Sequence, residues 1–214
     1  MKVITVLNFK GGTGKTFISV VLGELLMIAG KRAAVVDMDA QLTAVDALRR
    51  MDGGNVFPLL DVYASPGKAP DFAALRGRGY DFIVIDTPPQ IIDNAPIQSV
   101  IGSSDVFIVP MCLQRHSLFG FEKTLELLPE GRPVLPVCSM GPQAKTRGKR
   151  ELLELVREEL GEGGGDLCPA VFLPWYDRVD ENISARRDFF FLLRENEYAC
   201  FERLRDSLFS ALNK

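Results

Sequence analysis

Residues 3–16 read VITVLNFKGGTGKT, a short apolar run followed by a loop rich in glycine and lysine. The run Val3–Leu7 contains several β-branched residues and predicts a buried β-strand. Apolar residues at three- and four-residue spacing then predict a helix over Lys15–Ala29, which Gly30 closes. A strand, a glycine-rich loop and a helix, in this order, form the framework that binds phosphate groups in nucleotide-binding proteins. The stretch therefore predicts an α/β nucleotide-binding fold.

The loop supplies three kinds of phosphate contact. Its glycines allow backbone N–H groups to converge on phosphate oxygens, and the start of the following helix adds the positive end of its dipole. Lys15 would contact the β- and γ-phosphates, and the Thr16 hydroxyl would bind Mg²⁺. The predicted nucleotide-binding residues of this loop are Gly11, Gly12, Thr13, Gly14, Lys15, Thr16 and Phe17.

Apolar segments alternate with helical segments along the rest of the chain, which is typical of βαβ units around a parallel sheet. We therefore expect a single α/β domain over residues 1–214, with a doubly wound, mainly parallel sheet and helices on both faces. The predicted strands are Val3–Leu7, Ala33–Val36, Phe82–Ile85, Val106–Val109, Val134–Val137 and Val171–Leu173. The predicted helices are Lys15–Ala29, Leu42–Arg50, Leu118–Leu128, Lys149–Leu160 and Glu197–Leu212. The segment Asp52–Gly79 contains several prolines and glycines and yields no element prediction.

Two acidic segments follow predicted strands. Residues 37–41 read DMDAQ after the strand Ala33–Val36, and a carboxylate there would face the phosphates across the ends of parallel strands. Residues 81–89 read DFIVIDTPP, in which four apolar residues precede Asp86, as in a Walker B strand. Asp86 would hold Mg²⁺, usually through water. For Asp37 the alternatives of a solvated strand end or a helix cap remain open.

The loop departs from the ordinary Walker A pattern at its start. Phe9 occupies the position of the first glycine, and Lys10 follows it. The run from Lys10 to Thr16 resembles the deviant Walker A motif KGGxGK[ST] of the ParA/MinD family. This resemblance implies that Lys10 reaches across a dimer interface to the partner's nucleotide, and that Asp39 positions the attacking water and senses the γ-phosphate. Ala40 replaces the proline that is usual in the family, so we expect a less rigid loop.

The resemblance continues beyond Asp86 with a strand that ends in Pro110 and a helix that contains Gly120. It implies adenine contacts from Met140, Pro174 and Trp175. It also implies a dimeric ATPase that uses ATP and Mg²⁺. By this resemblance the catalytic residues are Lys10, Lys15, Asp39 and Asp86, and the metal-binding residues are Thr16, Asp39 and Asp86.

The family members differ in the surface that they bind, and charge bears on this choice. A formal net charge of -3 argues against a protein that coats nucleic acid by bulk charge, so DNA binding requires a local basic patch. The predicted DNA-binding residues are Lys145, Arg147, Lys149, Arg150, Arg186 and Arg187. Alternatively, the basic residues at 145–150 lie on a solvated helix face, where Glu151, Glu154 and Glu158 balance their charge.

The last predicted helix bears on membrane binding. Its apolar side suits either core packing or a membrane surface, and its acidic residues favour core packing. We expect a cytoplasmic protein, and the resemblance implies that it associates with the nucleoid when ATP is bound and is stimulated by a ParB-like or cargo adaptor protein. The alternatives are a MinD-like membrane-associated regulator and a small-molecule enzyme on the same scaffold. The four cysteines form no C-x-x-C pair and are expected to be reduced thiols.

Overall fold

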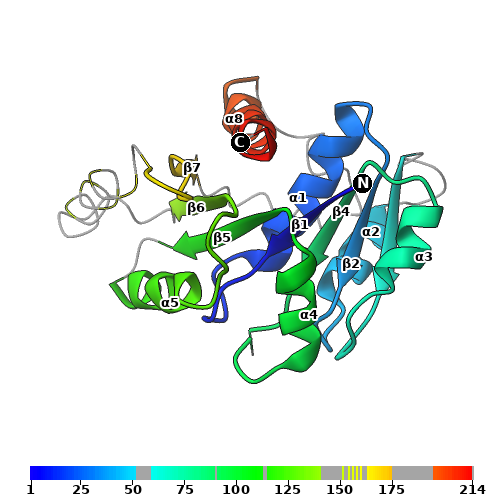
Figure 1. The fold of residues 1–214 in the computed structure, drawn as a ribbon. Coiled ribbons are helices and arrows are strands. Elements are labelled where there is room, and N and C mark those ends of the chain that lie inside the picture. Colours follow the sequence, from blue (N-terminus) through cyan, green and yellow to red (C-terminus); the bar gives the residue numbers. More distant parts are fainter. Residues whose placement is uncertain are drawn as a thin grey trace.

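The computed structural model describes residues 1–51, 59–89, 91–112, 115–140, 163–174 and 195–213, together with residues 151, 154, 156, 158 and 160. Within these residues, seven strands form one parallel sheet in the order β3-β2-β4-β1-β5-β6-β7 (Figure 1). The strands are β1 (Lys2–Val6), β2 (Ala33–Asp37), β3 (Leu60–Ala64), β4 (Phe82–Asp86), β5 (Val106–Cys112), β6 (Val134–Met140) and β7 (Val171–Pro174). The predicted parallel α/β architecture is confirmed.

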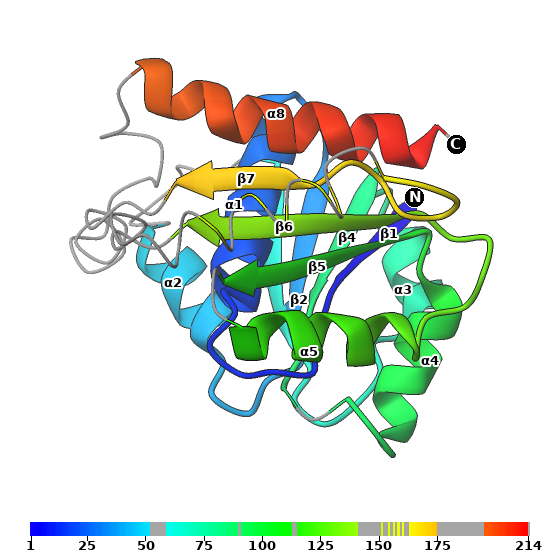
Figure 2. The same cartoon turned by 90° about the vertical axis from the view of Figure 1, so that its left-hand side faces the viewer.

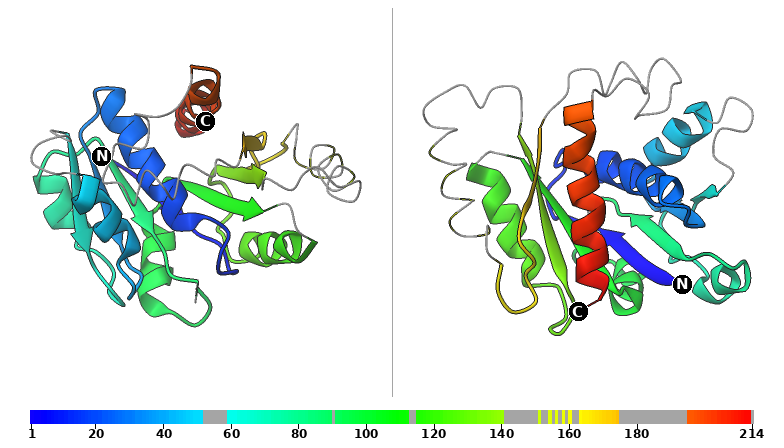
Figure 3. Two further views of the ribbon diagram at one scale, coloured as in Figure 1. Left: turned by 180° about the vertical axis from the view of Figure 1, so that it is seen from behind. Right: turned by 90° about the horizontal axis from the view of Figure 1, so that it is seen from above.

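Helices cover both faces of this sheet (Figures 1 and 2). One face packs against α1, α2 and α8, and the other packs against α3, α4, α5 and helical residues 156 and 160. The helices are α1 (Lys15–Ile28), α2 (Thr43–Met51), α3 (Phe72–Gly77), α4 (Ala95–Ser103), α5 (Arg115–Leu125) and α8 (Glu195–Leu212). Seen from behind and from above, α1 and α8 lie on the same side of the sheet (Figure 3).

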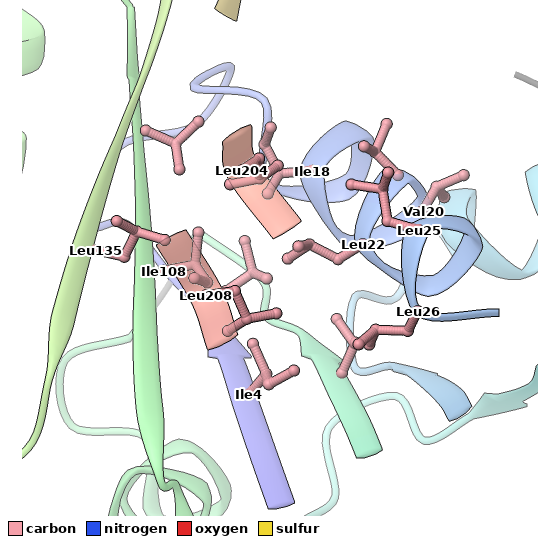
Figure 4. Close-up of a cluster of buried hydrophobic side chains, with 14 of the residues drawn as sticks. Ile4, Ile18, Val20, Leu22, Leu25, Leu26, Ile108, Leu135, Leu204 and Leu208 are labelled. Carbon is pink, nitrogen blue, oxygen red and sulfur yellow. The ribbon is translucent and has the colours of Figure 1, made fainter. Parts of the chain in front are cut away.

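The core beneath α1 and α8 is almost entirely aliphatic (Figure 4). Ile4 of β1 and Ile108 of β5 meet Leu22 of α1 and Leu204 and Leu208 of α8, and all five side chains are fully buried. Strands that are covered on both faces need apolar residues at every position, which explains why their sequences read as continuous apolar runs.

Every predicted strand is present, and the predicted helices near the two ends of the chain are confirmed. The helix predicted at Leu118–Leu128 instead spans Arg115–Leu125. Three elements were missed: β3, α3 and α4. β3 is an edge strand whose residues are partly buried or exposed, so its sequence lacks the continuous apolar run of the inner strands. Of the helix predicted at 149–160, residues 151, 154, 156, 158 and 160 are described and all are helical.

The apolar side of α8 is buried in the core. Phe201 packs edge-on against Phe17 of α1 with ring centroids 6.5 Å apart, and Phe209 packs against Phe82 of β4 at 5.9 Å. The prediction that this side packs in the core is therefore confirmed. None of the described helices is long and apolar enough to cross a membrane.

Truncation of the α8 core should destabilise the fold strongly. Leu204 is fully buried, so Leu204→Ala should lower the free energy of unfolding by about 2–5 kcal/mol, because it leaves a cavity between α8 and the sheet. Urea denaturation followed by circular dichroism measures this change. Ser210→Ala, at an exposed position of the same helix, is the matched control and should change stability by less than about 0.5 kcal/mol. Equal effects of the two changes would contradict the packing role of α8.

Candidate nucleotide-binding site

Three strands bring the predicted phosphate-binding and acidic residues to one edge of the sheet. Val6 of β1 and Asp37 of β2 both pair in register with Asp86 of β4. The glycine-rich loop leaves β1 at this edge and enters α1 at Lys15. In parallel α/β sheets, ligands bind outside the carboxyl ends of the strands. The sheet thus places the loop and both acidic segments around one site.

The loop conformation requires glycine at two positions. Gly12 and Gly14 have φ of 72° and 92°, which lie in the left-handed region that residues with a β-carbon rarely adopt. Gly14 is also the N-cap of α1 and provides no side-chain cap for the first N–H groups of the helix. Those N–H groups stay available for an anion at the positive end of the helix dipole. The loop and helix therefore form an anion-binding concavity.

Lys15 is held inside this concavity. Its side chain is only 7% exposed, and Nζ donates hydrogen bonds to the carbonyl oxygens of Asn8 (3.4 Å) and Lys10 (3.3 Å). Burial lowers the pKa of Lys15, and the charges of Asp86 and Asp39 oppose this shift. Both contacts are long, so phosphate oxygens can replace the two carbonyl oxygens at small cost. Lys15 therefore points its amino group into the phosphate-binding loop.

Asp86 is fully buried next to the start of α1. Ser19 Oγ donates to Asp86 Oδ1 at 3.0 Å, and the Thr16 side chain lies beside this carboxylate. Burial raises the pKa of Asp86 to about 7; the Thr16 and Ser19 hydroxyls and the Lys15 charge act against this, and the Asp37 charge adds to it. Among the described residues, Oδ2 has no hydrogen-bond partner.

These groups fit a magnesium ion. Mg²⁺ prefers oxygen ligands and is usually held by one or two protein groups together with substrate phosphates and water. A buried carboxylate oxygen without a partner, beside a threonine hydroxyl at the phosphate-binding helix, is such a donor set. The described residues contain no cluster of three or more acids, histidines or cysteines that could hold a metal ion.

The two acids of the 37–41 segment differ in environment. Asp37 is fully buried, and its Oδ2 accepts hydrogen bonds from the N–H groups of Ala44 (2.9 Å) and Val45 (3.2 Å) at the start of α2. Burial raises its pKa, whereas the backbone N–H groups of Val45, Asp39 and Ala44 lower it. Asp37 is thus the cap of α2, one of the alternatives left open by the sequence. Asp39 is half-buried, and its Oδ1 accepts a hydrogen bond from Gln41 N at 2.9 Å.

Several residues that were not predicted from the sequence hold the loop from the β5 side. Asn8 is fully buried; its Nδ2 donates to Pro110 O (2.7 Å), and its Oδ1 accepts from Lys10 N (2.8 Å). Cys112 Sγ donates to Gly12 O at 3.5 Å. Ser139 lies near Gly14, where an added β-carbon would be 3.7 Å from its Oγ. Cys112 and Ser139 lie at or near the carboxyl ends of β5 and β6, and that position is the sequence signal by which they could have been found.

The predicted adenine contacts are described only in part. Met140 and Pro174 are the last residues of β6 and β7 and pair in register, so their backbones lie at the same edge as the loop. Nothing is described of their side chains, and Trp175 lies outside the described residues. The predicted DNA-binding residues also lie outside them, namely Lys145, Arg147, Lys149, Arg150, Arg186 and Arg187.

Comparisons with known proteins agree with this geometry. The chromosome-partitioning ATPase Soj of Thermus thermophilus is 27% identical over 157 residues, which are 60% of this chain and 62% of that protein. The matched region is therefore shorter than two thirds of this relative. A putative plasmid partition protein of Borrelia burgdorferi bound to AMPPNP superposes with a TM-score of 0.74 at 18% identity, covering 98% of each chain.

A second structural match is a complex with DNA. The pNOB8 ParA bound to nonspecific DNA superposes with a TM-score of 0.58 at 20% identity, covering 98% of this chain and 93% of that one. At such identities the two structural matches establish a shared fold. The family model of the CobQ/CobB/MinD/ParA nucleotide-binding domain matches residues 4–181. The chain therefore belongs to the CobQ/CobB/MinD/ParA family of P-loop nucleotide-binding proteins.

Proposed function

We propose that residues 1–214 act as a single ParA-type ATPase domain that dimerises on ATP, binds DNA without sequence preference and positions a cargo. The observation that carries the ATPase proposal is the convergence of Lys15, Thr16 and Asp86 at the uncapped N-terminus of α1. Membership of a nucleotide-binding family and a fold shared with an AMPPNP complex support it.

In the proposed mechanism each residue has one task. The loop N–H groups and Lys15 bind the phosphates, and Thr16 and Asp86 hold Mg²⁺. The ion, held by Thr16 and Asp86, would offset the negative charge that develops during phosphoryl transfer. Asp39 orients the attacking water, and Lys10 of the partner subunit adds positive charge at the γ-phosphate. Hydrolysis needs positioning and electrostatic stabilisation more than covalent chemistry from the protein, and this set provides both.

The surface around Lys10 supports the dimer. Phe9 is 39% exposed and Ile92 46% exposed, and together with Pro89 and Ile91 they line a hollow of about 290 Å³. Phe119 of α5, which is 59% exposed, lies next to the glycine that contacts Lys10. Exposed apolar side chains grouped beside a functional site are typical of protein interfaces. A second copy of the chain that covered this surface would bring its own Lys10 toward the nucleotide.

We propose that the surface along which the ATP-bound dimer positions its cargo is nonspecific DNA. A ParB-like or cargo adaptor protein would stimulate hydrolysis. The solved complex of a ParA of the same fold with nonspecific DNA and the partition roles named for the relatives support this choice. The apolar side of α8, which would otherwise suit a membrane surface, is buried in the core. This burial favours the nucleoid over the membrane as the site of action.

Duplex DNA binding at several salt concentrations tests this proposal. With ATP we expect binding that weakens steeply with salt, by a log–log slope of about 0.9 for each phosphate contact, and with ADP we expect none. Replacing Arg147, Lys149 and Arg150 together with alanine should remove the binding. Replacing Lys2, Lys31 and Lys68, which are exposed elsewhere, removes the same charge and should leave most of it. Binding to anionic vesicles but not to DNA would instead favour a membrane-associated regulator.

A further inference from the structure

We infer that Asn8, Gly120 and Thr124 form a clamp that positions Lys10 for catalysis, an inference that rests on the proposed role of Lys10. These three residues are termed the Lys10 clamp below. All three are buried, and they hold the backbone on the N-terminal side of the phosphate loop against β5 and α5.

Two hydrogen bonds hold the residues that precede the loop glycines. The Phe9 N–H donates to Thr124 Oγ1 at 3.0 Å, and the Lys10 N–H donates to Asn8 Oδ1 at 2.8 Å. The Thr124 hydroxyl itself donates to Gly120 O at 2.7 Å, which turns its lone pairs toward Phe9. Because Asn8 Nδ2 is held by Pro110 O of β5, the amide oxygen that receives Lys10 N–H is also fixed in place.

Gly120 supplies the steric part of the clamp. A β-carbon added at this residue would lie 3.1 Å from Lys10 Cβ and 3.3 Å from Asn8 Oδ1. Both distances are shorter than ordinary van der Waals contact, so any larger side chain must push Lys10 away by a few tenths of an ångström. The absence of a side chain lets α5 pack directly against the Lys10 segment, and the direction in which Lys10 leaves the loop depends on that contact.

The clamp acts on Lys10 and leaves the phosphate-binding elements intact. Gly12 and Gly14 adopt their own left-handed conformations, and Lys15 belongs to α1 on the opposite face of the sheet from α5. Lys15 Nζ contacts the carbonyl oxygens of Asn8 and Lys10, but these contacts are long, at 3.4 and 3.3 Å, and phosphate oxygens can replace them when nucleotide binds. Loosening the clamp should therefore spare nucleotide binding by the monomer and impair the step that needs Lys10. A residue of purely structural importance would affect folding and nucleotide affinity together.

The matched variants Gly120→Ala and Gly102→Ala test the steric contact. Both add a methyl group to a helical glycine, which raises helix propensity, but Gly102 of α4 has no atom within 4 Å of the added carbon. For Gly120→Ala we expect kcat for ATP hydrolysis to fall about fivefold, because small misplacements of a catalytic group are costly, with ADP affinity changed less than about twofold. Gly102→Ala should match the wild type in both. An unchanged kcat for Gly120→Ala, or a parallel loss of ADP affinity, would overturn the inference.

The pair Thr124→Val and Thr124→Ser tests the hydrogen bond without relying on activity. Valine removes the oxygen that accepts the Phe9 N–H, whereas serine retains it. In nucleotide-free protein we expect hydrogen exchange of the Phe9 amide to accelerate about tenfold or more in Thr124→Val and to stay near the wild-type rate in Thr124→Ser. Equal exchange in both variants would contradict the clamp. If the wild-type protein hydrolyses no ATP but the two Thr124 variants show this exchange pattern, the proposed function is refuted, whereas the contact between Thr124 and Phe9 is supported.

Discussion

Asp86→Asn is expected to lower kcat for ATP hydrolysis by about 100-fold or more, since metal-ion stabilisation of a transition state contributes several kcal/mol. Asparagine keeps an oxygen that can accept the Ser19 hydrogen bond but removes the charge that attracts Mg²⁺. Phosphate release measured at saturating MgATP reports the loss. The matched control is Asp81→Asn, which changes an exposed residue directly before the first residue of β4. This variant should keep the wild-type rate.

The same substitution should stabilise the nucleotide-free protein above neutral pH. The Asp86 carboxyl has a pKa of about 7 in the folded state, because burial disfavours its charge, whereas in the unfolded chain it ionises near its ordinary value of 3.8. Between these two values the unfolded state releases a proton that the folded state retains, so the free energy of unfolding falls as pH rises. At pH 8 we expect Asp86→Asn to gain about 1–3 kcal/mol over the wild type.

Thermal melts of wild type and Asp86→Asn between pH 5 and pH 8, without nucleotide and Mg²⁺, measure this difference. The advantage of the variant should grow with pH across this window and level off above it. A variant that melts below the wild type at every pH would show that the Asp86 charge is not a source of strain in the free protein. Hydrolysis and stability are expected to change in opposite directions, which separates a functional carboxylate from a structural one.

Lys10→Ala is expected to weaken ATP-dependent dimerisation and to lower kcat by about 100-fold or more, since a cation supplied in trans to a transferring phosphoryl group contributes at least that much. ADP affinity should change little. The backbone of Lys10, and not its side chain, donates to Asn8 Oδ1 and accepts from Thr13 and Lys15, and alanine keeps these contacts. Light scattering with ATP and with ADP measures the dimer, and Lys31→Ala, at an exposed position before β2, is the control.

Mixing two inactive variants tests whether Lys10 acts in trans. In a mixed dimer of Lys10→Ala and Asp86→Asn, the subunit that retains Asp86 receives Lys10 from its partner, so one of the two sites is complete. At protein concentrations high enough for the two variants to pair at random, an equimolar mixture should recover about a quarter of the wild-type rate. A mixture no more active than its two components would place the action of Lys10 within its own subunit.

The sequence predicted the inner strands because their physical signal is local. β1, β2, β4, β5 and β6 are covered on both faces and read as apolar runs, each followed by polar residues or a loop. The glycine-rich loop was recognised because phosphate binding demands its residue types in a fixed order. The edge strand β3 was missed because a half-covered strand lacks that run: Tyr63 is only partly buried and Asp61 is exposed. The start of α4 had a usable signal, since Asn94 caps it and Pro96 follows in its first turn.

By itself the sequence determined the parallel α/β fold and the phosphate loop, because backbone conformation and burial depend on residues close together in the chain. Only the tertiary structure showed that Asp37 caps α2, that Ser19 supports Asp86, and that α5 contacts Lys10 through Gly120. These contacts join residues separated by up to about 110 positions in the chain. A contact of this kind has no local sequence signature, because it exists only once the sheet has brought the carboxyl ends of its strands to the same edge.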